Sequence, residues 1–461
     1  MALHVISDLH IGSGVLDDCD AGCEAGLIGF IDELTAGPSP VELVLNGDSF
    51  DFVQAEPWRV AGLEATAVDG SPLCFTRETS LAKAESIIKA HPLIFDALTR
   101  FVRREGARLT IMPGNHDADL YWPEVRELMG RRIHGQNTSH RARVNWYLDR
   151  VYRPARAPHV WIEHGHQHDP LNNFYAGTLE PLTEYWGAMN PPILRAKDGT
   201  DRLLECIGTR FLIRFLNELD ARYHFVDNIK PLSRFLGIFA SSANNLSGGT
   251  ARAALSALAF FRFAGVEGIV APSNLLSLGA QGEGLGAALR AIDEASDGAF
   301  SMALEDAGCD FGGRSFTMAT EDTDAAIGIL DHALAHLDTL DGVALDTDSI
   351  LGVDDEDDGM LSLAKGLKLD ETQILKDAAT LALKTPGVTH VIMGHTHEPV
   401  DEPHYKNIGS WTRYWQMTPG TSPSWAEMVA RAPSLPMSLR HAVVHDDPAQ
   451  GVTLQTYTPA A

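Results

Sequence analysis

The sequence predicts an α/β protein interrupted by a large, mostly helical insertion, and three observations lead to this prediction. Near the N-terminus, apolar runs rich in β-branched residues alternate with segments of helical periodicity, which is typical of strands alternating with helices. This alternation stops after Asp169 and resumes shortly before His395. The chain has 461 residues, more than one hydrophobic core usually serves. We therefore predict one α/β domain from residues 1–170 and 387–461, with residues 171–386 inserted as a cap.

The strands and helices of the α/β domain are predicted from the pattern of apolar side chains. Apolar, β-branched runs predict strands at residues 3–7, 41–46, 108–112, 160–163, 389–393, 405–408, 439–444 and 452–456. Apolar residues at helical spacing predict helices at residues 24–34 and 81–104. Pro113 and Gly114 end the third strand and turn the chain into a loop.

The insertion is rich in Ala, Leu and Gly and has few strand signals. Helical spacing predicts helices at residues 201–223, 251–263, 284–291, 322–337 and 370–383. The apolar stripe at residues 253–263 either lines a pocket for an acyl chain or a base, or forms the core of a helical unit. An insertion of this length is tolerated because the entropy of loop closure grows slowly with length.

Composition argues against several classes of protein. The net charge of −26 argues against a protein that wraps nucleic acid over its whole surface. No uncharged apolar stretch reaches the roughly 18 residues of a membrane span, so none is expected. Five scattered cysteines imply no disulfide framework and favour a reducing, cytoplasmic compartment. The first predicted strand begins near Leu3, which leaves no room for a signal peptide.

Five short segments, each directly after a predicted strand, carry polar residues suited to metal binding. They are Asp8-Leu9-His10, Gly47-Asp48 with Asp51 close behind, Gly114-Asn115-His116-Asp117, Glu163-His164-Gly165-His166, and Gly394-His395-Thr396-His397. Carboxylate and amide oxygens together with imidazole nitrogens suit first-row divalent metals such as Mn, Fe or Zn. Two such ions about 3.5–4 Å apart stabilise in-line displacement at phosphorus. These motif segments therefore predict a pair of metal ions.

The motif segments resemble those of the calcineurin-like metallophosphoesterase superfamily, which read D-x-H, G-D-x-x-D, G-N-H-D/E, H and G-H-x-H. The resemblance spans residues 8–397 and implies a four-layer α/β/β/α sandwich in which a hydroxide shared by two ions attacks phosphorus. It implies seven ligands, which are Asp8, His10, Asp48, Asn115, His164, His395 and His397. Asp48 would bridge the two ions. Asp8, His10 and His397 would hold the first ion, and Asn115, His164 and His395 would complete the second. Mn²⁺ is the expected ion, with Fe, Zn or Ni as alternatives.

Several further polar residues of the motif segments are candidates for catalysis. His116 is expected to face the substrate and to stabilise phosphoryl charge or protonate the leaving oxygen. Either Asp51 or Asp117 would orient His116 through a hydrogen bond, and the sequence does not separate the two. His166 is expected behind the ligands or facing substrate, and His168 at the surface or in a local hydrogen bond.

The expected activity is that of a metal-dependent phosphoric ester hydrolase, either a phosphodiesterase or a nucleotide-type pyrophosphohydrolase acting on a small-molecule phosphate ester or diphosphate. The segment from Gly394 to Pro399, with the Asn-x-Gly-x-Trp that follows, looks like the branch that contains UDP-2,3-diacylglucosamine pyrophosphatases. Members of that branch commonly carry Arg in place of His116. A nuclease acting on DNA or RNA is the alternative, and an inactive metallophosphoesterase fold used as a binding scaffold is the candidate from another class. We expect the Asn and Trp of residues 405–411 to pack rather than to shape the site.

Overall fold

The computed structural model describes two compact units of the chain. One comprises Met1–Lys230, Asp370–Gln416 and Ala432–Ala461, and the other comprises Pro231–Leu369 and Met417–Arg431. The predicted domain boundaries near residues 170 and 387 stay a prediction. Within these units the described residues are 2–16, 19–56, 76–169, 172–176, 187–188, 190–195, 201–204, 206, 208–209, 212–213, 217, 289–290, 293, 296, 298–322, 325–326, 328–329, 332–333, 371–414, 425–445 and 450–459.

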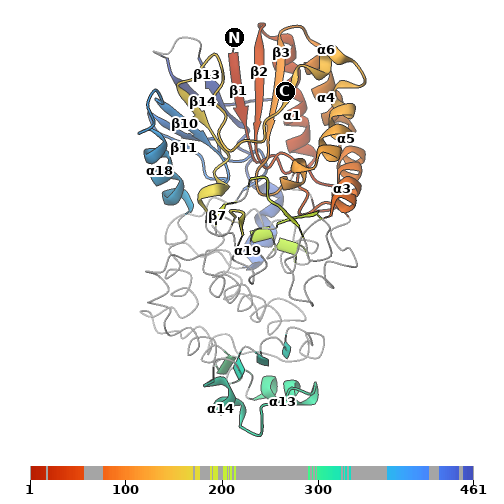
Figure 1. Ribbon diagram of the computed structural model, residues 1–461, viewed down its shortest axis with the longest axis vertical. Helices are drawn as coiled ribbons and strands as arrows, with labels where there is room; N and C mark the ends of the chain where they lie inside the picture. Colours follow the sequence, from red (N-terminus) through yellow and green to blue (C-terminus); the bar gives the residue numbers. More distant parts are fainter. Residues whose placement is uncertain are drawn as a thin grey trace. The chain divides into compact units, whose positions relative to one another are not determined.

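A six-stranded sheet carries the first three motif segments (Figure 1). Its strands are β14 (Val452–Thr456), β13 (Arg440–Val444), β1 (Ala2–Ile6), β2 (Val41–Asn46), β3 (Ala107–Met112) and β4 (Val144–Trp146), in that spatial order. The strands β1 to β4 are parallel, whereas β13 is antiparallel to both β1 and β14. Because the carboxyl ends of parallel strands lie at one edge of a sheet, the loops after β1, β2 and β3 are neighbours.

A four-stranded sheet carries the last two motif segments. Its order is β11 (Val400–Asp401), β12 (Tyr405–Asn407), β10 (His390–Met393) and β5 (Val160–Ile162), and β10 is parallel to both β5 and β12. The loops that follow β5 and β10 therefore also lie side by side. The predicted α/β class is confirmed.

Apolar side chains of the two sheets share one core, and helices cover their other faces. Val5 and Val44 of the first sheet pack in one cluster with Val160, Ile162 and Ile392 of the second. On the opposite face of the first sheet, the alternate strand residues pack with α1 (Ala21–Ala36), α3 (Arg77–Ala90), α4 (Pro92–Arg103) and α5 (Pro123–His134) (Figure 1). Helix α18 (Glu371–Ala382) packs against β10 and β12. Burial on both faces explains why apolar residues predominate in β1, β2, β5 and β10.

Local sequence signals set where these helices begin and end. The side chain of Asp20 accepts hydrogen bonds from the backbone N–H groups of Gly22 and Cys23, at 2.8 and 2.9 Å, and so caps α1. The single helix predicted for residues 81–104 is wrong, because α3 ends at Ala90 and α4 begins at Pro92. Proline lacks the N–H that a continuing helix needs, whereas it fits the first turn of a new one.

The described part of the predicted insertion includes short strands as well as helices. Strand β6 (Tyr175–Ala176) pairs with β7 (Gly187–Ala188), and β8 (Ile193–Arg195) pairs with β9 (Asp201–Leu203). The helix predicted to begin at residue 201 is therefore wrong at its start. Pro191 and Pro192 favour extended backbone before them, and the Pro192 carbonyl accepts from the N–H of Leu204 at 2.8 Å, which closes this hairpin.

The remaining described elements are short. They are α6 (Thr138–Arg141), α13 (Ala299–Asp306), α14 (Phe316–Thr320), α19 (Trp425–Arg431) and the 3₁₀ turns η1 (Ala118–Tyr121), η2 (His166–His168) and η6 (Ala432–Ser434). The helix predicted for residues 251–263, with its apolar stripe, lies outside the described residues. Within the described part of the chain, no helix is both long enough and apolar enough to cross a membrane.

Candidate metal centre

Hydrogen bonds join motif segments of both sheets to one another. The N–H of Asp8 donates to the carbonyl of Gly47 at 3.2 Å, and the N–H of Gly394 donates to the carbonyl of His164 at 2.9 Å. The N–H of His395 donates to both carboxylate oxygens of Asp8 at 3.1 Å. Loops from both sheets therefore meet at one place, which we call the candidate centre and define by the seven predicted ligands.

Backbone strain is concentrated at the candidate centre. Six non-glycine residues in the described part of the chain have positive φ, and five of them are predicted ligands: Asp8 (55°), His10 (46°), Asp48 (46°), His395 (74°) and His397 (58°). A non-glycine residue in this region costs about 1–3 kcal/mol and persists where the surrounding structure holds it, as at functional sites. The concentration of strained residues at these five predicted ligands therefore indicates a functional site.

One group of ligands comprises Asp8, His10 and His397, whose ligand atoms all lie within 4.8 Å of one another. Nε2 of His10 lies 3.1 Å from Nε2 of His397, which lies 3.4 Å from Oδ1 of Asp8. Two atoms that bind one ion at about 2.0–2.2 Å, at angles of about 90–110°, are about 2.8–3.6 Å apart. The spacing of this group therefore fits one divalent ion.

A second group comprises Asp48, His164 and His395, again with ligand atoms within 4.8 Å of one another. Nε2 of His164 lies 3.1 Å from Oδ2 of Asp48, while its Nδ1 lies 2.8 Å from the carbonyl of Asn46 and donates to it. This hydrogen bond leaves Nε2 as the nitrogen available to an ion. The side-chain oxygen of Asn115 is buried and has no hydrogen-bond partner among the described residues, which suits a ligand.

Asp48 has contacts toward both groups of predicted ligands. Its Oδ2 faces His164 of the second group, and its Oδ1 accepts from the backbone N–H of His116 at 2.8 Å. The carbonyl of Asp48 accepts from the N–H groups of Leu9 and His10, at 2.9 and 3.0 Å, so that its loop is bound to the first group as well. Asp48 thus contacts the surroundings of both groups.

Two motif positions have to be glycine because neighbouring side chains lie too close for a Cβ atom. A Cβ atom at Gly114 would collide with the carboxylate of Asp48, and one at Gly394 would collide with the side chains of Ser7 and Asp8. A larger residue at either position would displace a predicted ligand. The glycines therefore set how closely the loops can approach one another.

Asp51, rather than Asp117, contacts the ring of His116. Oδ2 of Asp51 accepts from Nδ1 of His116 at 2.8 Å and from Nδ1 of His10 at 2.9 Å. Burial alone would raise the pKa of Asp51, but the charges and hydrogen bonds of His116 and His10 outweigh burial and lower it. Asp51 therefore orients both the candidate catalytic ring and one ligand.

Asp117 has a structural role in the loops instead. Its carboxylate accepts from the backbone N–H groups of Ser49 at 2.9 Å, Asp48 at 3.2 Å and Phe50 at 3.3 Å, and also from that of Gly114. Burial and then the charge of Asp48 raise the pKa of Asp117 to about 7. Asp117 thereby ties the second motif segment to the third.

The electrostatics of the candidate centre favour a cation. Burial would raise the pKa of Asp8, yet His164 and His397 lower it to about 2. Burial would likewise lower the pKa of His164, yet the charges of Asp48 and Asp8 raise it to about 10. Carboxylates that hold a proton so tightly on a neighbouring imidazole provide a negative potential in which a divalent ion is stabilised.

His166 and His168 differ in their surroundings. The buried ring of His166 packs 5.4 Å from that of His164 and 5.5 Å from that of Phe174, between ring centroids. Burial, then the charges of His164 and His395, hold its pKa well below the ordinary value. Nε2 of His168 instead lies 2.8 Å from Oε1 of Glu163, in the local hydrogen bond that was one of its two predicted roles.

Sequence reasoning missed three residues that hold the motif loops. Oδ2 of Asp169 accepts from Nε2 of His395 at 2.9 Å, and Asp169 is fully buried. Nδ2 of Asn407 donates to the carbonyl of Gly394 at 2.8 Å, and Oγ of Ser410 donates to the carbonyl of Asp8 at 3.1 Å. The expectation that Asn407 only packs is therefore wrong. The available signal was position, since each of the three residues shortly follows a motif segment.

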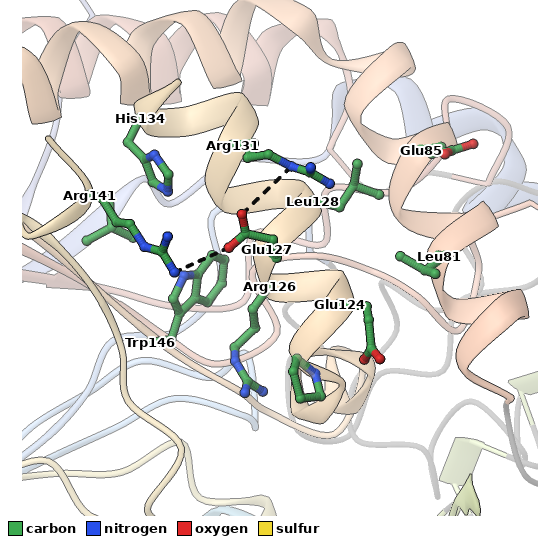
Figure 2. A pocket seen from close by; sticks show the side chains of 12 residues that line it. Leu81, Glu85, Glu124, Arg126, Glu127, Leu128, Arg131, His134, Arg141 and Trp146 are labelled. Carbon is green, nitrogen blue, oxygen red and sulfur yellow. Dashed lines mark ion pairs between the residues drawn. The ribbon is translucent and has the colours of Figure 1, made fainter. Parts of the chain in front are cut away.

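A cavity of about 800 Å³ lies on the outer helices, and no predicted ligand lines it (Figure 2). Leu81 and Glu85 of α3, residues of α5, Arg141 and Trp146 line it. Its Arg131 and Arg141 both pair with Glu127, at 3.9 and 3.4 Å. Glu85 and Glu124 line the cavity as well, so that its arginines are accompanied by several acidic side chains.

Comparison with known proteins gives no family to set beside this geometry. No protein-family model matches the chain, and no curated protein or solved structure matches it either. The chemistry of the candidate centre is therefore argued from its own side chains: two groups of carboxylates and imidazoles with metal-ligand spacing, on strained loops, beside an oriented histidine.

Proposed function

We propose that this protein is a dinuclear metal-dependent phosphoester hydrolase with the four-layer α/β/β/α sandwich of the metallophosphoesterases. The observation that carries the proposal is the convergence of two ligand groups, with Asp48 in contact with the surroundings of both. Two sheets that share a core, each covered outside by helices, support the proposed sandwich. Mn²⁺ is the proposed ion, with Fe, Zn or Ni as alternatives, because mixed carboxylate, amide and imidazole ligands suit first-row divalent metals.

The residues of the candidate centre have separable roles in this proposal. Two divalent ions, when bound, supply Lewis acidity and make a water molecule more acidic. His116 would stabilise phosphoryl oxygens or protonate the leaving oxygen, since Asp51 holds its Nδ1 and so leaves Nε2 for the substrate. Its side chain is 12% exposed, so that it is held firmly yet within reach of a ligand.

A phosphodiester or a nucleotide-type diphosphate is the proposed substrate class. The retained pair of His116 and Asp51 supports activity over the alternative of an inactive scaffold, because a scaffold has no need of an oriented general acid. A nuclease stays the second candidate activity. The net charge of −26 disfavours it, because polynucleotide binding gains most of its affinity from cationic side chains.

Turnover of bis-p-nitrophenyl phosphate with Mn²⁺ tests the proposal. We expect Asp48→Asn to abolish turnover and weaken both ions, because the shared carboxylate charge is lost. We expect His116→Ala to retain both ions and to lose about 10²–10³-fold in rate through lost stabilisation of phosphoryl charge, because p-nitrophenolate leaves without protonation. Asp32→Asn is the matched control, since it removes only an exposed ion pair with Arg100. Absence of Mn²⁺-dependent turnover on a panel of a diester, a monoester, a sugar-nucleotide diphosphate and single-stranded DNA would favour the scaffold.

A further inference from the structure

Two polar residues outside the motif segments connect two of the predicted ligands. Asp169 lies 2.9 Å from Nε2 of His395, as described above. Nδ2 of Asn172 donates to the same oxygen of Asp169, Oδ2, at 2.6 Å. Oδ1 of Asn172 in turn accepts from Nδ2 of Asn115 at 3.4 Å. A chain of hydrogen bonds thus runs from His395 through Asp169 and Asn172 to Asn115.

The direction of every bond in this chain follows from the carboxylate. An ionised carboxylate only accepts, so Asn172 has to present its NH₂ group to Asp169. The oxygen of the Asn172 amide then faces Asn115, which has to present its own NH₂ group there. The oxygen of Asn115 is left on the other side, where it is buried without a hydrogen-bond partner among the described residues. Asp169 thereby fixes which atom of Asn115 is offered to an ion.

The same carboxylate also fixes the ring of His395. A hydrogen bond from Nε2 to Asp169 keeps the proton on that nitrogen and leaves the other ring nitrogen with its lone pair. Both effects concern ligands predicted for the second ion.

A short segment of the predicted insertion holds Asn172 in place. The thiol of Cys206 lies 3.7 Å from Oδ1 of Asn172. It also forms a hydrogen bond with the hydroxyl of Thr209, at 3.1 Å. A Cβ atom at Gly208 would collide with the same oxygen of Asn172. The backbone near Gly208 therefore lies directly against the amide, and a side chain there would push the amide away.

We propose that Asp169 and Asn172 are positioning residues that set the affinity for the second ion, held by Asp48, Asn115, His164 and His395. The inference rests on the proposed two-ion site. Loss of a residue that orients a metal ligand typically weakens metal binding about 10–100-fold. The change is selective: the second ion weakens and the first does not. A residue that only stabilises the fold would weaken both ions together.

Calorimetric titration of the metal-free, full-length protein with Mn²⁺ tests the inference, with electron paramagnetic resonance to distinguish a coupled pair of ions from a single ion. In Asp169→Asn we expect one site of unchanged affinity and one about 10–100-fold weaker. The coupled spectrum should give way to that of a single ion at Mn²⁺ concentrations that fill both wild-type sites, and should return at higher Mn²⁺. Gly208→Ala should weaken the second ion severalfold while every polar group is retained. This second variant decides the matter if Asp169→Asn fails to fold.

Glu42→Gln is the matched control, because it changes a buried carboxylate outside the motif segments, which accepts hydrogen bonds from the hydroxyls of Thr110 and Tyr152. We expect both affinities to stay within about twofold of wild type there. Equal weakening of both ions, or wild-type affinity for both in Asp169→Asn and Gly208→Ala, would overturn the inference. Wild-type protein that binds no Mn²⁺ would instead overturn the proposed function, so the two failures are distinguishable.

Discussion

Replacing Asp51 with Asn tests how the candidate centre controls the protons on its histidines. Oδ2 of Asp51 accepts from Nδ1 of His10 and of His116, while Oδ1 accepts from the backbone N–H groups of Val53 and Gln54 at 3.0 and 2.9 Å. An amide at this position keeps only one oxygen. If the two backbone donors retain that oxygen, the NH₂ group is turned toward the two rings.

The cost of this change can be worked out from the position of His10. Two N–H groups cannot bond to each other, so each ring has to move its proton from Nδ1 to Nε2. Nε2 of His10 is the nitrogen that lies 3.1 Å from Nε2 of His397, where an ion would bind. Returning the proton to Nδ1 leaves an unpaired buried donor, which costs about 1–3 kcal/mol. That cost corresponds to about 5–150-fold in metal affinity.

Calorimetric titration with Mn²⁺ and urea denaturation measure the two consequences separately. We expect the ion bound by His10 to weaken by about 5–150-fold. The free energy of unfolding should change by only about 1 kcal/mol, since the deprotonated Nδ1 atoms of both rings accept from the new amide NH₂ group. Asp32→Asn, at an exposed ion pair, should leave both quantities unchanged. Wild-type affinity for both ions in the Asp51 variant would refute this account of the tautomers.

Two further predictions concern stability. Gly114→Ala should lose about 1–3 kcal/mol in urea denaturation and weaken Mn²⁺ binding, because its Cβ would lie 2.6 Å from the backbone nitrogen of Asp48. Gly328→Ala, whose Cβ meets nothing within 4 Å, should lose no stability, and an equal loss there would contradict the steric argument. Burial, followed by neighbouring histidines, lowers the pKa of both His4 and His441 from 6.5 to about 4. The unfolded chain binds protons on these rings more readily than the folded protein does. The folded protein is therefore most stable above about pH 6.5, where both rings are neutral in either state. Lowering the pH to 5 costs about 2 kcal/mol of folding stability for each ring. In urea denaturation at pH 7.5 and 5.0, His441→Phe should reduce the difference by about this amount, and an unchanged difference would show that the ring does not titrate as described.

The strand-end position of the ligands could be predicted from the sequence because it depends on local pattern. Each polar motif segment directly follows an apolar run, and parallel strands bring such ends to one edge of a sheet. The break between α3 and α4 could also have been predicted from the sequence, since Pro92 stands at the first position of α4. The helix predicted from residue 201 went wrong because helical spacing and a short paired strand cannot be told apart over three residues.

The partners of the ligands could not be predicted, because they depend on side-chain direction after folding. Asp51 and Asp117 are equally plausible partners of His116 in sequence, and only the folded loops turn one carboxylate to the ring and the other to backbone N–H groups. Asp169 bonds a histidine that lies 226 positions away. No local pattern encodes a contact of that separation.

The position of β13 beside β1 has a consequence for biosynthesis. The carbonyl of Asp8 accepts from the N–H of Trp411 at 3.2 Å, and β1 lies between β2 and a strand that ends at Val444. A nascent chain on the ribosome therefore carries β1 with one unpaired edge until nearly all of these residues have been translated. Binding of the two proposed ions, which needs His395 and His397, should accordingly follow translation of most of the chain, and chaperones have a long interval in which to shield that edge.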